Sequence, residues 1–136
     1  FNMTKGPTMA GHVIEEVVRR AGIDASEVDD CIMGSAMQQH TTGQNIGRLA
    51  ALAGGLPVTV AGMSIDRQCA SGMMAVATAA KQVMVDGMDI VVGGGVESIS
   101  LVQFVSGIRI ISIPMIAAIL FKLFISLFFR VKTQVQ

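Results

Sequence analysis

Apolar and polar positions alternate at helical spacing in the first segment of the chain. Residues 8–21 repeat apolar side chains every three to four positions, which predicts an amphipathic helix ended by Gly22. We expect the buried face of this helix to carry Met9, Val13, Val17 and Ala21.

Two further helices are predicted downstream. Residues 44–53 form the first, which stops at Gly54-Gly55, and its expected buried side is Ile46, Leu49, Ala50 and Ala53. Residues 70–85 form the second, whose early turns are rich in small residues. Because this helix has so few large polar groups, we expect it to be buried on several sides.

Short apolar runs at 28–36, 58–65 and 89–92 predict strands, and the last run leads into Gly93-Gly94-Gly95. Helices separate these strands, which is typical of crossover units. The fold class indicated is therefore α/β, with a largely parallel sheet flanked by helices.

Composition excludes some classes of function. Lys plus Arg equals Asp plus Glu at 10 each, and Trp and Tyr are absent, so no electrostatic or stacking surface for nucleic acid is expected. Apolar residues make up 51% and mean hydropathy is +0.61. Such a high apolar content indicates either helices and strands that are buried on most sides or one segment that contacts a membrane.

Only two cysteines occur, Cys31 and Cys69, and they form no C-x-x-C pair. A disulfide framework or a metal site such as zinc is not expected, and a reducing compartment is favoured. The chain begins at Phe1 without a signal-peptide pattern, so we expect its true start to be missing.

Cys69 falls just after a predicted strand and at the start of a predicted helix. In open α/β sheets ligands bind there, and N–H groups at a helix N-terminus favour a thiolate. This effect is small, so full activation needs another group, most naturally a histidine. The alternative is a buried, inert cysteine, which is our interpretation of Cys31 inside its strand.

Two sequence motifs resemble those of a known enzyme family. Q-C-A-S-G-M at residues 68–73 and G-G-G-V-E-S-I-S at 93–100 are similar to the nucleophile region of the thiolases. G-Q-N-I-G-R at 43–48 and A-G-G-L-P at 53–57 resemble the helix and turn before it. The resemblance spans roughly residues 8–103, so residues 1–103 are interpreted as a partial thiolase N-terminal domain, the first half of a thiolase-like fold.

The resemblance implies acyl transfer between coenzyme A thioesters, with Cys69 as the acyl-thioester nucleophile and no tightly bound cofactor. Acetyl-CoA acetyltransferase is the first choice, and a 3-ketoacyl-CoA thiolase of longer chains is the alternative. A homodimer or tetramer is implied for the full-length family. Ketosynthases also use a cysteine, but Arg67-Gln68 before it and Ala70-Ser71-Gly72 after it favour a thiolase.

The sequence also departs from the family. The G-H-P, N-E-A-F-like and C-x-G-G-G segments that hold its other catalytic groups do not occur, and the only histidines are His12 and His40. We expect His12 to lie on the surface and His40 to be an ordinary loop residue. The hypothesis is that this chain alone has almost no thiolase activity. A non-catalytic relative that pairs with a full-length subunit is an alternative.

Residues 104–136 form an apolar tail that does not resemble the family. From Ile110 to Phe129, 13 of 20 residues are Leu, Ile or Phe, and Lys122 is the only charge. Three interpretations stay open: an aberrantly joined coding sequence, a membrane anchor over 110–129, or a buried helix. We expect a cytoplasmic location, with mitochondrial or peroxisomal as alternatives.

Overall fold

The computed structural model describes residues 2–101. The tail predicted over residues 104–136 lies outside them. These described residues form three α-helices and three strands: α1 (Gly6–Ala21), β1 (Asp30–Gly34), α2 (Ile46–Ala53), β2 (Ala61–Ile65), α3 (Ser71–Lys81) and β3 (Val91–Gly95). A π-helical turn, Gln82–Asp86, extends α3, and 3₁₀ turns occupy Ala25–Glu27, His40–Thr42 and Ile99–Leu101.

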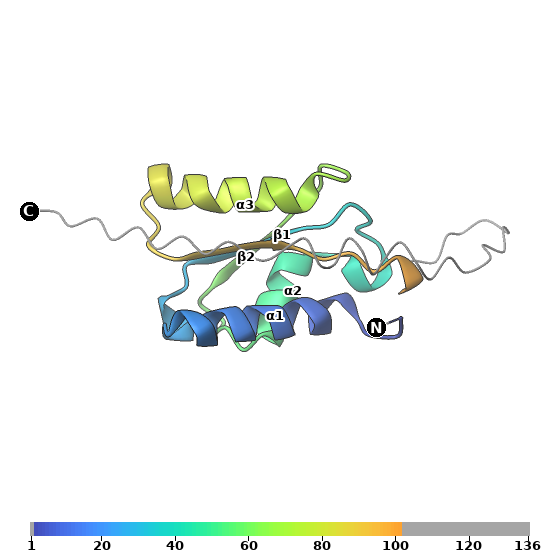
Figure 1. Cartoon of the computed structure of the whole chain (residues 1–136), viewed down its shortest axis with the longest axis horizontal. Helices are drawn as coiled ribbons and strands as arrows, with labels where there is room; N and C mark the ends of the chain where they lie inside the picture. The colour runs from blue at the N-terminus through green and yellow to red at the C-terminus, as the bar shows by residue number, and fades with distance from the viewer. Residues whose placement is uncertain (1, 102–136) are drawn as a thin grey trace, which may run out of the picture.

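The three strands form one parallel sheet in the order β2-β1-β3, with Ile32 of β1 between Met63 and Gly93. Figure 1 shows α3 on one face of this sheet and α1 and α2 on the other. The predicted α/β class with a parallel sheet is confirmed. Strands β1 and β2 are shorter than their predicted runs, 28–36 and 58–65, because residues at the ends of these runs belong to the connections. Strand β3 begins two residues after the start of the run 89–92 and continues through the glycines to Gly95.

The buried face of α1 is one residue away from the predicted face. Ala10, Gly11, Ile14 and Val18 are buried, whereas Val13 is 41% exposed. The cause is a close helix contact, since a Cβ at Gly11 would lie 2.8 Å from the backbone of Ala53. This approach of α2 turns the side of α1 that carries Gly11 inward. The prediction is wrong for Val13 and Ala21, which are exposed, whereas Met9 and Val17 are partly buried and Met9 packs against the hydrophobic core.

The larger hydrophobic core lies between the sheet and the pair α1–α2. Its centre holds three side chains that are almost completely buried, Ile14, Ile46 and Cys31. On α2 the prediction holds for Ile46 and Ala50, but Gly47 and Ala51 are buried in place of Leu49 and Ala53.

Strand β2 lies at the edge of the sheet, and α2 covers its outer side. The Asn45 amide donates to the carbonyl of Gly62 at 2.7 Å, and the Arg48 guanidinium donates to Val58 at 3.0 Å and to Val60. These side chains therefore bind one carbonyl of β2 and two carbonyls of the segment that leads into it.

A smaller core lies between the sheet and α3, where Ile32 and Val91 meet Ala75 and Ala79. Only Ser71, Ala75 and Ala79 of α3 are buried, and Met73 on its outer side is 67% exposed. Within residues 2–101 the expectation that this helix is buried on several sides is therefore wrong, because one sheet face covers it and no described element covers the other side.

No helix within residues 2–101 combines the length and the apolar character needed to cross a bilayer.

The corrected face of α1 can be tested with two neighbouring residues. Ile14→Ala leaves a cavity at a side chain that is 2% exposed, so we expect the free energy of unfolding to fall by about 2–5 kcal/mol. Val13→Ala should change it by less than about 0.5 kcal/mol. Urea denaturation followed by circular dichroism measures the free energy of unfolding of both variants. Equal decreases in the two variants would contradict the assignment of Ile14 to the buried face of α1.

Candidate active site

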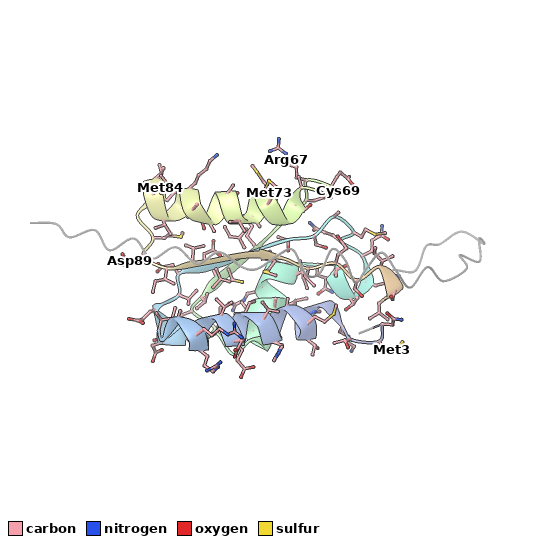
Figure 2. All side chains as sticks on the ribbon, in the orientation of Figure 1. Met3, Arg67, Cys69, Met73, Met84 and Asp89 are labelled. Atoms are coloured by element: carbon pink, nitrogen blue, oxygen red, sulfur yellow. The ribbon has the colours of Figure 1, made fainter. Side chains whose placement is uncertain are left out.

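Cys69 lies in the turn between β2 and α3, two residues before the helix begins. Its side chain is exposed, and Figure 2 shows it at the end of α3 beside Arg67. All three strands run the same way, so this turn stands at the carboxyl edge of the sheet. The prediction that Cys69 lies between a strand and the start of a helix is confirmed. In open α/β sheets this edge is where ligands generally bind.

Hydrogen bonds inside the turn hold its shape. The buried Ser71 hydroxyl accepts from the N–H of Arg67 at 2.8 Å and donates to the carbonyl of Gln68 at 2.6 Å. The Asp66 carboxylate accepts from the N–H of Gln68 at 2.9 Å. Gln68 itself has a φ of 50°, a left-handed conformation that costs a side chain other than glycine about 1 kcal/mol or more. Surrounding contacts therefore hold the residue before the thiol in a strained backbone conformation.

The N–H groups at the start of α3 are not all free. Ala70 N–H donates to the carbonyl of Arg67 at 3.1 Å, and Ser71 N–H donates to that of Gln68 at 3.0 Å. These two N–H groups are therefore already paired with carbonyl groups of the turn.

Glycines beneath the turn let α3 approach the sheet closely. A Cβ at Gly34 would lie 2.2 Å from the carbonyl of Ser71, well inside any real contact, and a Cβ at Gly95 would lie 3.0 Å from Cα of Gly72. Gly34 and Gly95 are the last residues of β1 and β3 and are paired in the sheet. The backbone of the first turn of α3 therefore rests directly on the ends of two strands.

Glu97 joins two segments of this edge. Its carboxylate accepts from the N–H groups of Ala36 at 2.8 Å and Met37 at 3.2 Å and from the Ser35 hydroxyl at 3.3 Å. The loop after β1 is thereby tied to the segment after β3. The sequence analysis missed this role, although an acidic residue two positions after a glycine-rich strand end was a signal.

Neither histidine reaches Cys69 through a hydrogen bond in the described part of the chain. His12 is exposed on α1, on the opposite side of the sheet from α3. His40 is exposed in the 3₁₀ turn after β1, with a φ of 48°. The prediction that His12 lies on the surface is confirmed.

Cys31 is fully buried in the core between the sheet and α1–α2. Burial, with the nearby Asp30 carboxylate as a second cause, raises the pKa of its thiol to about 12. The predicted position of Cys31 inside a buried strand is confirmed, and its inertness stays a prediction that follows from this burial. Residues 2–101 also contain no group of three His, Cys, Asp or Glu side chains arranged to hold a metal ion.

Comparison with known proteins decides the family. Residues 1–123 match the family model described as "Thiolase, N-terminal domain". The chain belongs to the thiolase family.

Similar proteins agree with this assignment. The thiolase chain is 38% identical over 108 residues to a 3-ketoacyl-CoA thiolase of Acinetobacter baumannii (strain AYE), covering 79% of this chain and 28% of that protein. It is 41% identical over 93 residues to a 3-oxoadipyl-CoA/3-oxo-5,6-dehydrosuberyl-CoA thiolase of Escherichia coli (strain K12), covering 68% and 23%.

A solved structure supports the fold. The Bacillus anthracis acetyl-CoA acetyltransferase is similar with a TM-score of 0.68 and 40% identity, over 82% of this chain and 29% of that one. The thiolase chain thus spans between 23% and 29% of the length of these relatives.

Because α3 lies so close to the end of β1, adding one methyl group at Gly34 should lower the stability of the fold. Gly34→Ala must displace the backbone of Ser71, so we expect it to destabilise the fold by about 1–3 kcal/mol. The matched control is Gly94→Ala, whose Cβ would meet only the Met33 side chain at an ordinary 3.4 Å. Thermal unfolding measures the difference, and equal effects of the two substitutions would contradict the contact.

The two thiols should differ in reactivity. At pH 8 iodoacetamide should alkylate Cys69 in the folded chain and leave Cys31 unmodified, because Cys31 is buried and un-ionised. In urea both should react. Peptide mass spectrometry identifies the modified residue, and labelling of Cys31 without denaturant would contradict its burial.

Proposed function

We propose that this protein is an acyltransferase of the thiolase type, in which Cys69 carries the acyl group between two coenzyme A thioesters. The observation that carries the proposal is the exposed Cys69 thiol on a constrained turn at the carboxyl edge of a parallel sheet, in a chain of the thiolase family.

The chemistry suits a sulfur nucleophile. The Cys69 thiolate attacks the carbonyl carbon of an acyl-CoA, the carbon–sulfur bond to coenzyme A breaks, and coenzyme A leaves as its thiolate, which takes up a proton. The acyl group then leaves Cys69 when a second acyl-CoA, deprotonated at its α-carbon, or a free coenzyme A attacks the new thioester. Forming a covalent intermediate divides one difficult step into two easier ones.

The turn fixes the position of the Cys69 thiol, but it does not supply a group that would activate this thiol. Gln68, held in the left-handed conformation, and the buried Ser71 fix the backbone on both sides of Cys69. A fixed nucleophile needs less reorganisation before attack. The general base and a complete set of oxyanion donors have no counterpart among the contacts of Cys69 in residues 2–101, so the chain alone is proposed to turn over very slowly.

The names of the relatives support a class of substrate, the coenzyme A thioesters, and not a particular acyl chain. The Bacillus structure is titled an acetyl-CoA acetyltransferase, and the Acinetobacter relative is named a 3-ketoacyl-CoA thiolase. We favour acetyl-CoA and acetoacetyl-CoA, with longer 3-ketoacyl-CoA thioesters as the second choice. A homodimer or tetramer is proposed for the complete enzyme.

The test is a steady-state assay of the 136-residue chain with acetoacetyl-CoA and coenzyme A. A missing base lowers the rate by about 10²–10⁴-fold and a missing oxyanion donor by about 10²–10³-fold. Turnover should therefore lie at least about 10⁴-fold below that of the Acinetobacter thiolase assayed in parallel. Turnover near that of the relative would contradict the proposed inactivity of the chain alone.

Acylation of Cys69 is measured separately. After incubation with acetyl-CoA and an acid quench, peptide mass spectrometry should find an acetyl group on Cys69 and none on Cys31. Cys69→Ser should abolish the labelled peptide, and Cys31→Ala should leave it unchanged. Acetylation spread over lysines, with no excess at Cys69, would contradict the nucleophile.

A further inference from the structure

The Glu97 carboxylate binds main-chain N–H groups and no cation of the described chain. The N–H groups of Ala36 and Met37 donate to it at 2.8 and 3.2 Å, and the Ser35 hydroxyl donates to it at 3.3 Å. No ion pair within residues 2–101 involves Glu97. A hydrogen bond from an N–H group to a charged carboxylate is roughly twice as strong as one between neutral groups. The charge of Glu97 therefore holds the main chain of this loop in place.

The loop that Glu97 holds lies beside the start of the Cys69 turn. Ser35, the first residue of the loop, is 1% exposed, and its N–H donates to the carbonyl of Ile65 at 3.0 Å. Ile65 is the last residue of β2, so the Cys69 turn begins with the next residue. Because β1 is the central strand of the sheet, the loop after it starts between this turn and the segment that carries Glu97.

A second connection runs beneath the turn. The Val96 N–H donates to the carbonyl of Gly34 at 3.0 Å, and Gly34 lies so close to the carbonyl of Ser71 that a Cβ would not fit between them. The Ser71 hydroxyl donates to the carbonyl of Gln68 at 2.6 Å. Close-packed contacts transmit a displacement, so a shift of the chain at Gly34 also moves the residue before Cys69.

We propose that Glu97 is a positioning residue for the acylation of Cys69. Its carboxylate fixes the loop after β1, and this loop fixes the turn that presents the thiol to an acyl-CoA. The inference rests on the proposed function of the chain as a thiolase-type acyltransferase. The hydrogen bonds of Glu97 within residues 2–101 do not include Cys69, so Glu97 acts through the main chain and not on the thiol.

Two reactions of the Cys69 thiol in the full chain test this role. Acetylation by acetyl-CoA needs a defined approach of the sulfur to a carbonyl carbon, whereas alkylation by iodoacetamide needs only an accessible thiol. Because a displacement of about 1 Å can cost about 10²-fold in rate, Glu97→Ala should slow acetylation about 10–100-fold. The same variant should change the rate of alkylation less than about twofold. Peptide mass spectrometry at pH 8 measures both rates.

Two conservative variants separate hydrogen bonding from charge. Glu97→Gln keeps the length of the side chain and one oxygen that accepts N–H groups, so acetylation should stay within about threefold of the wild type. Glu97→Asp keeps the charge but withdraws it by one methylene from Ala36 and Met37, so acetylation should fall about tenfold. The opposite order, with Asp active and Gln impaired, would show that the charge itself is needed and would overturn the positioning role.

Asp29→Ala is the matched control at the other edge of the sheet. The Asp29 carboxylate accepts from the N–H groups of Asp89 at 2.8 Å and Ile90 at 3.1 Å, so it also ties the chain beside β1 to the chain beside β3. Figure 2 shows Asp89 at the opposite end of the sheet from Cys69. Effects of distant sites are independent, so acetylation should stay within about twofold of the wild type. Equal slowing by Asp29→Ala and Glu97→Ala would reveal a general loss of stability and overturn the proposal.

Amide hydrogen exchange measures the order of the turn without any reaction. The N–H groups of Arg67 and Gln68 are bonded inside the turn at 2.8 and 2.9 Å, and in Glu97→Ala they should exchange about tenfold faster than in the wild type. Asp29→Ala should leave their exchange unchanged. Equal exchange in the wild type and in Glu97→Ala would overturn the proposal. A wild-type chain that is never acetylated at Cys69 would instead contradict the proposed function, and the exchange rates would still decide whether Glu97 orders the turn.

Discussion

The contact between the first turn of α3 and the ends of β1 and β3 sets the geometry of this molecule. Gly34 and Gly95 present no side chains, so the backbone at Ser71 and Gly72 approaches to a distance at which a Cβ could not fit. Further along, a Cβ at Gly93 would lie 2.9 Å from Ala79, so the close spacing continues down the helix. The height of α3 above the sheet, and with it the position of the Cys69 turn, follows from these missing side chains.

The carboxyl edge of the sheet then acts as one connected unit. Main-chain hydrogen bonds link Ser35 to Ile65 and Val96 to Gly34, both at 3.0 Å, so the segment after β1 is bonded to the end of β2 and the segment after β3 to the end of β1. The Glu97 carboxylate adds bonds to the loop after β1. A thiol placed on this edge stands on a rigid support, which is the condition for holding a nucleophile near its reactive geometry.

Local patterns predicted the order of elements, the parallel sheet and the place of Cys69, because strand and helix periodicity and glycine stops are properties of short segments. The buried face of α1 was not predictable in this way, since it depends on Gly11 meeting Ala53 across more than forty residues of sequence. The same holds for Glu97, whose partners lie about sixty positions away. For α3 the pattern indicated burial on several sides, while the described residues cover one side only.

The burial of Cys31 has a consequence for redox chemistry. The only other sulfur able to form a disulfide belongs to Cys69, which lies on the α3 side of the sheet, whereas Cys31 packs in the core on the side of α1 and α2. The folded domain therefore cannot close an internal disulfide. An oxidant that reaches Cys69 yields a sulfenic acid or a mixed disulfide with an external thiol such as glutathione, and both products are reversible.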